Sequence, residues 1–133
     1  FGPDVVIGLM ATDGTIQTGI YGRKAKSMKL AMVVPDKEHQ AMVMEAIYGE
    51  KGVKAGYTDG YCKEVLLKAA EHLVKDKGAQ ALILGCTELP LILEETDNLK
   101  LGDGHAAIVD PTSSLARRVV KVAGEITKIR GVR

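Results

Sequence analysis

Four short apolar runs, separated by helix-like segments, constrain the fold of this chain more than any other feature of its sequence. They lie at residues 5–11, 30–34, 81–86 and 106–110. Each run is continuous rather than alternating, which is typical of strands that are covered on both faces. Strands that alternate with helices form βαβ units with right-handed crossovers over a parallel sheet. The pattern predicts an α/β protein, a three-layer α/β/α sandwich around a four-stranded parallel sheet.

The segments between the apolar runs carry helix signals. Asp36 is placed to cap a helix, and Pro111 stands where a first helical residue often does. Apolar residues repeat at three and four positions between Tyr61 and Lys77. We therefore expect helices over about 16–21, 36–48, 61–77 and 112–130, and a glycine-bearing loop over 49–60.

Length and charge exclude several classes of protein. A chain of 133 residues fits one domain, residues 1–133, and a net charge of +1 gives no reason to expect nucleic acid or a membrane surface. The apolar run Ala81–Cys86 is far shorter than the ~20 residues that span a membrane, and no basic-then-apolar leader opens the chain. Two cysteines are too few for a disulfide framework, so we expect a cytoplasmic setting. The first residue is Phe1 rather than Met, and we expect the chain to be part of a longer protein.

Two strand ends carry candidate binding groups. Thr12 and Thr15 follow the first predicted strand, and Thr87 follows the third. Sites in open parallel sheets form at the carboxyl ends of strands, where free backbone N–H groups and hydroxyls suit a carboxylate or a phosphate. For the first loop, composition alone favours the alternative of an ordinary Asp-Gly turn with a threonine cap.

Cys86 is the sharpest catalytic candidate. It stands between a strand and a predicted helical turn, where exposed amides would give it thiolate character, and Glu88 could orient it or relay a proton. The alternative is a buried cysteine that acts as a small hydrophobic residue. Cys62 lies at the start of an amphipathic helix without a polar cluster, which favours a structural or surface thiol.

The remaining ionisable residues give weaker signals. His39 and His72 lie in predicted helices among charged residues, where we expect them to be solvated, and His105 precedes the fourth strand. No pair of histidines has ligand spacing together with a carboxylate, so we expect no metal site. Lys51 and Lys54 are either solvated charges or part of a loop that closes over an acidic substrate.

Taken in order, the motifs resemble the second half of the aspartate/glutamate racemase superfamily, with the aspartate racemases the most similar branch. They are Ala-Thr-Asp-Gly-Thr at 11–15, Ile-Tyr-Gly at 47–49, Lys-Ala-Gly at 54–56, Gly-Cys-Thr-Glu-Leu-Pro-Leu at 85–91 and Val-Asp-Pro-Thr at 109–112. The Gly-Cys-Thr-Glu segment is the most specific of these. The resemblance implies one of the two similar domains of the racemase fold.

The resemblance also implies an activity and roles for residues. The family inverts the α-carbon of an acidic amino acid without a cofactor, using two cysteines, one from each domain, as acid and base on opposite faces. By position Cys86 would be the second cysteine, and Thr12 and Thr87 would hold the substrate carboxylate. Lys54, less securely Lys51, would approach the side-chain carboxylate, with Tyr48 nearby. No metal or prosthetic group is implied.

The first half of the family, with its own Cys-Asn-Thr-type motif, is absent, and Cys62 lacks the context to replace it. We expect the chain to be inactive alone and the final helix, within 111–133, to pack on the missing first domain. A second copy of the chain could instead supply the other face. Two further alternatives are a non-catalytic dicarboxylate-binding module and a related cysteine-dependent isomerase or decarboxylase.

Overall fold

A five-stranded sheet organises the fold in the computed structural model, which describes residues 1–131. The strand order is β2-β1-β3-β5-β4. Its parallel members are β1 (Val6–Met10), β2 (Ala31–Val33), β3 (Ala81–Leu84) and β5 (Gly104–Val109), which correspond to the four apolar runs. The fifth strand, β4 (Thr96–Leu101), pairs antiparallel with β5 at the edge. The expected all-parallel sheet of four strands was therefore wrong: the sheet has five strands and is mixed.

The strand that sequence analysis missed has little apolar signal. Only Leu101 of β4 is buried, and the pairing with β5 is irregular between Thr96 and Leu99. An edge strand needs one apolar face at most, so its composition resembles that of a loop. Gly102, with φ +59°, forms the tight turn that joins β4 to β5.

The helices lie close to their predicted positions. They are α1 (Asp13–Thr18), α2 (Ile20–Ser27), α3 (Lys37–Tyr48), α4 (Tyr61–Lys75) and α5 (Pro111–Arg130), with 3-10 turns η1 (Val53–Ala55) and η2 (Leu89–Leu91). The single short helix expected over 16–21 is instead two helices, because Gly19 adopts a left-handed conformation, φ +67°, between them. Asp36 caps α3 as expected, its side chain accepting the His39 N–H.

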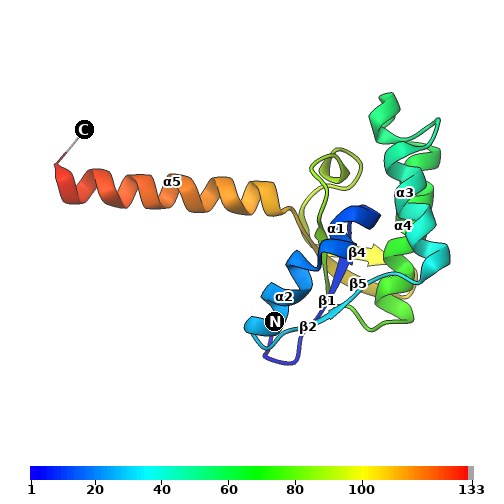
Figure 1. Cartoon of the computed structure of the whole chain (residues 1–133), viewed down its shortest axis with the longest axis horizontal. Coiled ribbons are helices and arrows are strands. Elements are labelled where there is room, and N and C mark those ends of the chain that lie inside the picture. The colour runs from blue at the N-terminus through cyan, green and yellow to red at the C-terminus, as the bar shows by residue number, and fades with distance from the viewer. Residues whose placement is uncertain (132–133) are drawn as a thin grey trace.

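One face of the sheet is fully covered and the other is not. The hairpin of α3 and α4 lies against one face, where Ile47, Leu66 and Leu73 are completely buried together with strand residues such as Leu82. The short helices α1 and α2 lie on the other face, beside β1 and β2 (Figure 1). The third layer of the expected sandwich is therefore thin.

The final helix stands apart from this core. Figure 1 shows α5 extending away from the sheet, and none of its residues is buried. The expected helix is confirmed through Arg130, while Val132 and Arg133 lie outside the described residues. Among residues 1–131, no helix has both the length and the apolar character needed to cross a membrane.

Candidate functional site

The loops that follow β1 and β3 meet at the carboxyl edge of the sheet. These strands are parallel neighbours, with Met10 opposite Leu84, and the Gly85 N–H donates to the Met10 carbonyl at 2.7 Å. A Cβ on Gly85 would lie 2.8 Å from a Leu9 methyl group, so only glycine lets the two chain segments approach this closely. The contact places Cys86 beside the end of β1.

Glu88 is the centre of the polar cluster at this edge. Its Oε2 accepts hydrogen bonds from Cys86 Sγ at 2.9 Å and from Thr87 Oγ1 at 3.0 Å, and its Oε1 accepts one from Lys54 Nζ at 2.8 Å. Lys54 Nζ also lies 5.5 Å from the centroid of the Tyr48 ring, a cation–π arrangement. The fold thus brings together Tyr48 and Lys54 from the end of α3 and from η1 with three consecutive residues after β3.

These contacts fix the resting charges of the cluster. The donated hydrogen bonds from Cys86 and Lys54 lower the pKa of Glu88 to about 2. Burial, followed by the hydrogen bond to Glu88, raises the pKa of the Cys86 thiol. Hydrogen bonding to Glu88 raises the pKa of Lys54. The resting cluster is therefore a neutral thiol, a carboxylate and an ammonium group.

The expected thiolate character of Cys86 was wrong for this resting state. The segment after Cys86 forms only the three-residue turn η2 and not a helix with a substantial dipole. Backbone N–H groups of Glu88 and Leu89 do lower the thiol pKa, but burial and the Glu88 carboxylate outweigh them.

Thr12 lies in the neighbouring loop and caps α1. Its Oγ1 accepts the Thr15 N–H at 3.3 Å and lies 3.1 Å from Thr15 Oγ1. The threonine-capped turn, one of the two interpretations open from sequence, therefore describes the present use of this hydroxyl.

A residue that sequence analysis missed holds the Thr12 loop in place. Gln40 of α3 donates through Nε2 to the Ala11 carbonyl at 2.9 Å and to Asp13 Oδ1 at 2.8 Å. Its Oε1 is buried and has no hydrogen-bond partner among residues 1–131. The contact joins residues 29 and 27 positions apart, so no local sequence pattern could have indicated it.

The other candidate residues, Cys62 and Lys51, make no hydrogen bond to the Glu88 cluster within residues 1–131. Cys62 is completely buried in α4, and its Sγ faces the carbonyls of Asp59 at 3.4 Å and Tyr57 at 3.6 Å. It is thus a structural thiol rather than a surface one. Lys51 is exposed in the turn after α3.

The chain matches a known protein family over most of its length. The family described as Asp/Glu/Hydantoin racemase matches residues 4–119. The chain belongs to this family. An uncharacterized protein from Pectobacterium carotovorum subsp. carotovorum is 32% identical over 117 residues, which are 86% of this chain and 71% of that protein.

Solved racemase structures share the fold. An aspartate racemase homologue from Pyrococcus horikoshii OT3 matches with a TM-score of 0.71 and 26% identity, covering 90% of this chain and 48% of that one. An aspartate racemase from Picrophilus torridus matches with a TM-score of 0.59 and 28% identity, covering 91% and 46%. The racemase-family chain therefore spans about half the length of these structures.

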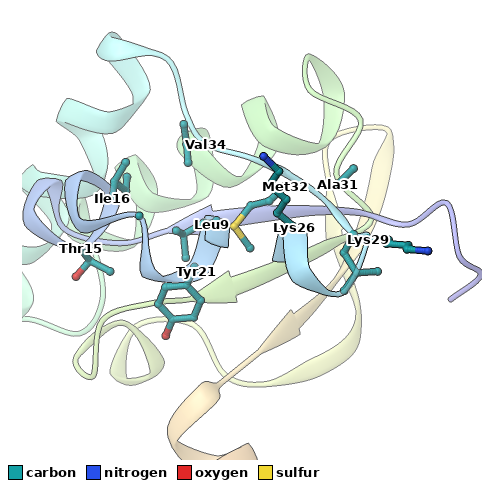
Figure 2. Close-up of a pocket in the computed structure, with 12 residues that line it drawn as sticks. Leu9, Thr15, Ile16, Tyr21, Lys26, Lys29, Ala31, Met32 and Val34 are labelled. Atoms are coloured by element: carbon teal, nitrogen blue, oxygen red, sulfur yellow. The ribbon is translucent and has the colours of Figure 1, made fainter. Parts of the chain in front are cut away.

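A hollow on the thinly covered face of the sheet is separate from the Cys86 cluster. Its volume is about 480 Å³, and it lies between α2 and the strands β1 and β2. Figure 2 shows Leu9 and Met32 of the two strands in this hollow, with Tyr21 beside them. None of the residues that line it belongs to the Glu88 cluster.

Proposed function

We propose that this chain provides one catalytic face of a racemase that inverts the α-carbon of aspartate or glutamate without a cofactor. The observation that carries the proposal is the connected set Cys86, Thr87, Glu88 and Lys54 at the carboxyl edge of the sheet. Membership of the Asp/Glu/Hydantoin racemase family supports the same class of substrate. The two free cysteines support a reducing, cytoplasmic setting.

Cys86 is the acid of this proposal. When a base on the opposite face of the substrate removes the α-hydrogen, the Cys86 thiol donates its proton to the carbanion and becomes a thiolate. In the reverse direction the Cys86 thiolate takes the α-hydrogen and the group on the other face returns a proton. The raised pKa of Cys86 supports the protonated starting state. Glu88 accepts the thiol hydrogen bond at 2.9 Å and is a positioning residue.

The substrate carboxylates have candidate partners in the same cluster. Thr87 and Thr12 would hold the α-carboxylate with their hydroxyls, and Lys54 would bind the side-chain carboxylate. Lys54 must then exchange Glu88 for the substrate, which its exposed position permits, since 45% of its side chain is accessible. Tyr48 would keep the ammonium group near the cluster through the face of its ring.

We propose that the chain is inactive alone, since it contributes one acid/base group to a reaction that needs two. The solved relatives are about twice as long as this chain, which supports a second half as the missing partner. A second copy of this chain, facing the first through its own Cys86, is the alternative source of that group.

The test is a racemisation assay on L-aspartate and L-glutamate with chiral separation of the products. It compares this chain alone with a fusion that places the first half of an aspartate racemase upstream of Phe1. We expect turnover only from the fusion, and its loss by at least ~100-fold in the Cys86→Ser variant. Turnover by the chain alone at an ordinary enzyme rate of about 1–1000 s⁻¹ would contradict the proposed incompleteness. Turnover by the fusion that survives Cys86→Ser would contradict the assignment of Cys86.

The raised thiol pKa also favours a second candidate, a binding module that holds a dicarboxylate without chemistry. In that case the chain would bind aspartate or another dicarboxylate saturably, and Cys86→Ser would leave the affinity unchanged. A related cysteine-dependent isomerase or decarboxylase is distinguished by its products in the same assay, because a decarboxylase releases carbon dioxide.

A further inference from the structure

Two histidines that lie 33 residues apart in the sequence come together with a carboxylate at the start of α3. One ligand atom each from Asp36, His39 and His72 lies within 4.8 Å of the others. Asp36 is the N-cap of α3, His39 lies in the first turn of that helix, and His72 lies in the last turn of α4. His72 is buried, 6% exposed, so the expectation that it is solvated was wrong, whereas His39 is partly exposed.

His72 has a carboxylate at one ring nitrogen and the start of α3 at the other. Its Nδ1 lies 2.7 Å from Asp76 Oδ2, while its Nε2 accepts the Asp36 N–H at 3.3 Å. The Nδ1 proton is therefore directed at a carboxylate. The Nε2 lone pair accepts the Asp36 N–H at the long distance of 3.3 Å, and an ion bound at Nε2 would replace this hydrogen bond. A carboxylate behind the distal nitrogen is the usual arrangement for a metal-binding histidine, since it fixes the tautomer and makes the ring more basic.

We propose that Asp36, His39 and His72 bind a divalent transition-metal ion of the zinc class, with water in the fourth position. Tetrahedral zinc with bonds of ~2.0 Å needs ligand atoms about 3.3 Å apart. His72 Nε2 and Asp36 Oδ2 are already 3.7 Å apart. Two imidazoles and a carboxylate are a donor set that zinc accepts readily.

His39 must rotate to complete the site. Its ring now stacks on His72, with centroids 3.9 Å apart and planes 5° from parallel, and its Nδ1 lies 2.6 Å from Asp36 Oδ1. Ring nitrogens in parallel planes cannot both direct lone pairs at one ion. The His39 side chain is 22% exposed, so it can turn its ring out of the stack toward the space above Asp36.

The surroundings are compatible with a cation. Asp76, which contacts His72, adds a second carboxylate beside that of Asp36, and Glu71, Lys68 and Lys75 line the same hollow. Lys68 lies 3.2 Å from Glu64, which offsets its charge. The ion would join the first turn of α3 to the last turn of α4 and thereby stabilise their hairpin.

The proposed metal site is separate from the Cys86 cluster and does not rest on the proposed racemase function. Asp36 and Tyr48 lie at opposite ends of α3, and a helix of 12 residues is about 18 Å long at 1.5 Å per residue. Neither Cys86 nor Glu88 is among the proposed ligands.

The experiment is a titration of the purified chain, freed of metal with EDTA, with Zn²⁺ by calorimetry and with Co²⁺ by visible absorption. We expect one equivalent of either ion to bind and the Co²⁺ complex to show tetrahedral bands without thiolate-to-cobalt charge transfer. His39→Ala should weaken binding at least tenfold. The matched control is His105→Ala, because His105 is an exposed histidine on β5 and should leave the affinity unchanged.

Three results would overturn the proposal. They are no binding up to about 1 mM metal, equal binding by the parent chain and His39→Ala, and a thiolate charge-transfer band that places the ion on a cysteine. Asp36→Asn supplies a second variant, which keeps an oxygen for capping α3 but removes the anionic ligand, and it should also bind at least tenfold more weakly. The side chains of His39 and Asp36 are 22% and 46% exposed, so neither substitution opens a cavity in the fully buried core.

Discussion

The two longest helices of this chain, α4 and α5, differ sharply in how much they bury. Both carry apolar residues at helical spacing. α4 buries seven residues, including Leu66 and Leu73, between α3 and the sheet, whereas α5 buries none and extends away from the sheet (Figure 1). Leu115, Val119 and Ile129 of α5 are 64%, 56% and 85% exposed. The two helices therefore differ in whether other elements cover their apolar residues, and not in the spacing of those residues.

The two helices mark two sides of the molecule: a finished side, where the apolar residues are packed, and an open side, where they are exposed. The finished side consists of α3, α4 and the sheet face that they cover. The open side includes α5 and the exposed edge of the Cys86 cluster, where Thr87 is accessible. Both open features agree with a chain that spans about half the length of its solved relatives. That α5 packs on a first domain stays a prediction.

The largest expected effect is on the free energy of unfolding, which should fall much more for a substitution in α4 than for the same substitution in α5. Leu73→Ala should lower the free energy of unfolding by about 2–5 kcal/mol, because it leaves a cavity in a fully buried site. Leu115→Ala, the same change on α5, should cost less than about 0.5 kcal/mol. Urea unfolding followed by circular dichroism measures both. Equal losses would mean that α5 is packed in solution, either on this chain or on a second copy.

A smaller effect is expected in the alkylation of Cys86 on the open side, with Cys62 on the finished side for comparison. Glu88→Gln removes the carboxylate that helps to raise the pKa of Cys86, so the pH midpoint of its alkylation by iodoacetamide should fall. At neutral pH the rate should rise, since a lower thiol pKa increases the fraction of reactive thiolate. Cys62, which is fully buried, is the internal control and should stay unmodified in the folded chain. A midpoint that does not move would show that Glu88 has no influence on the thiol.

Much of the finished side could be predicted from the sequence because its signals are local. Continuous apolar runs identified four of the five strands, and caps such as Asp36 located the helix starts. The strand β4 was missed because an edge strand with polar residues at Thr96, Asp97 and Asn98 has no apolar period.

The site was predictable only where a general rule about sheets applies. Parallel neighbours end at the same edge, and this rule correctly places Cys86 beside the Thr12 loop. The Lys54–Glu88 ion pair and the His39–His72 stack join residues more than 30 positions apart, and they depend on how the α3–α4 hairpin packs. The expected thiolate character of Cys86 was wrong because the thiol pKa depends on burial and on the Glu88 carboxylate, whose orientation the sequence does not specify.

The smallest effect concerns the pH dependence of stability on the open side. The pKa of Glu88 is lowered to about 2 in the folded chain, against about 4.3 when unfolded. A carboxyl group with a depressed folded pKa stabilises the fold above its unfolded pKa, and that stabilisation is lost as the pH falls from about 4.3 toward 2. Because the Lys54–Glu88 pair is accessible to solvent, the loss should be about 1 kcal/mol or less.

Urea unfolding at pH 7 and at about pH 3 measures this loss, with Glu88→Gln as the comparison. The variant should lose less stability on acidification than the parent chain, whereas Leu115→Ala should follow the parent because it changes no charge. An identical pH dependence in Glu88→Gln and the parent would mean that the cluster is not formed without its partner. The open side would then differ from the finished side in order as well as in burial, and the Cys86 site would be assembled only when the second half binds.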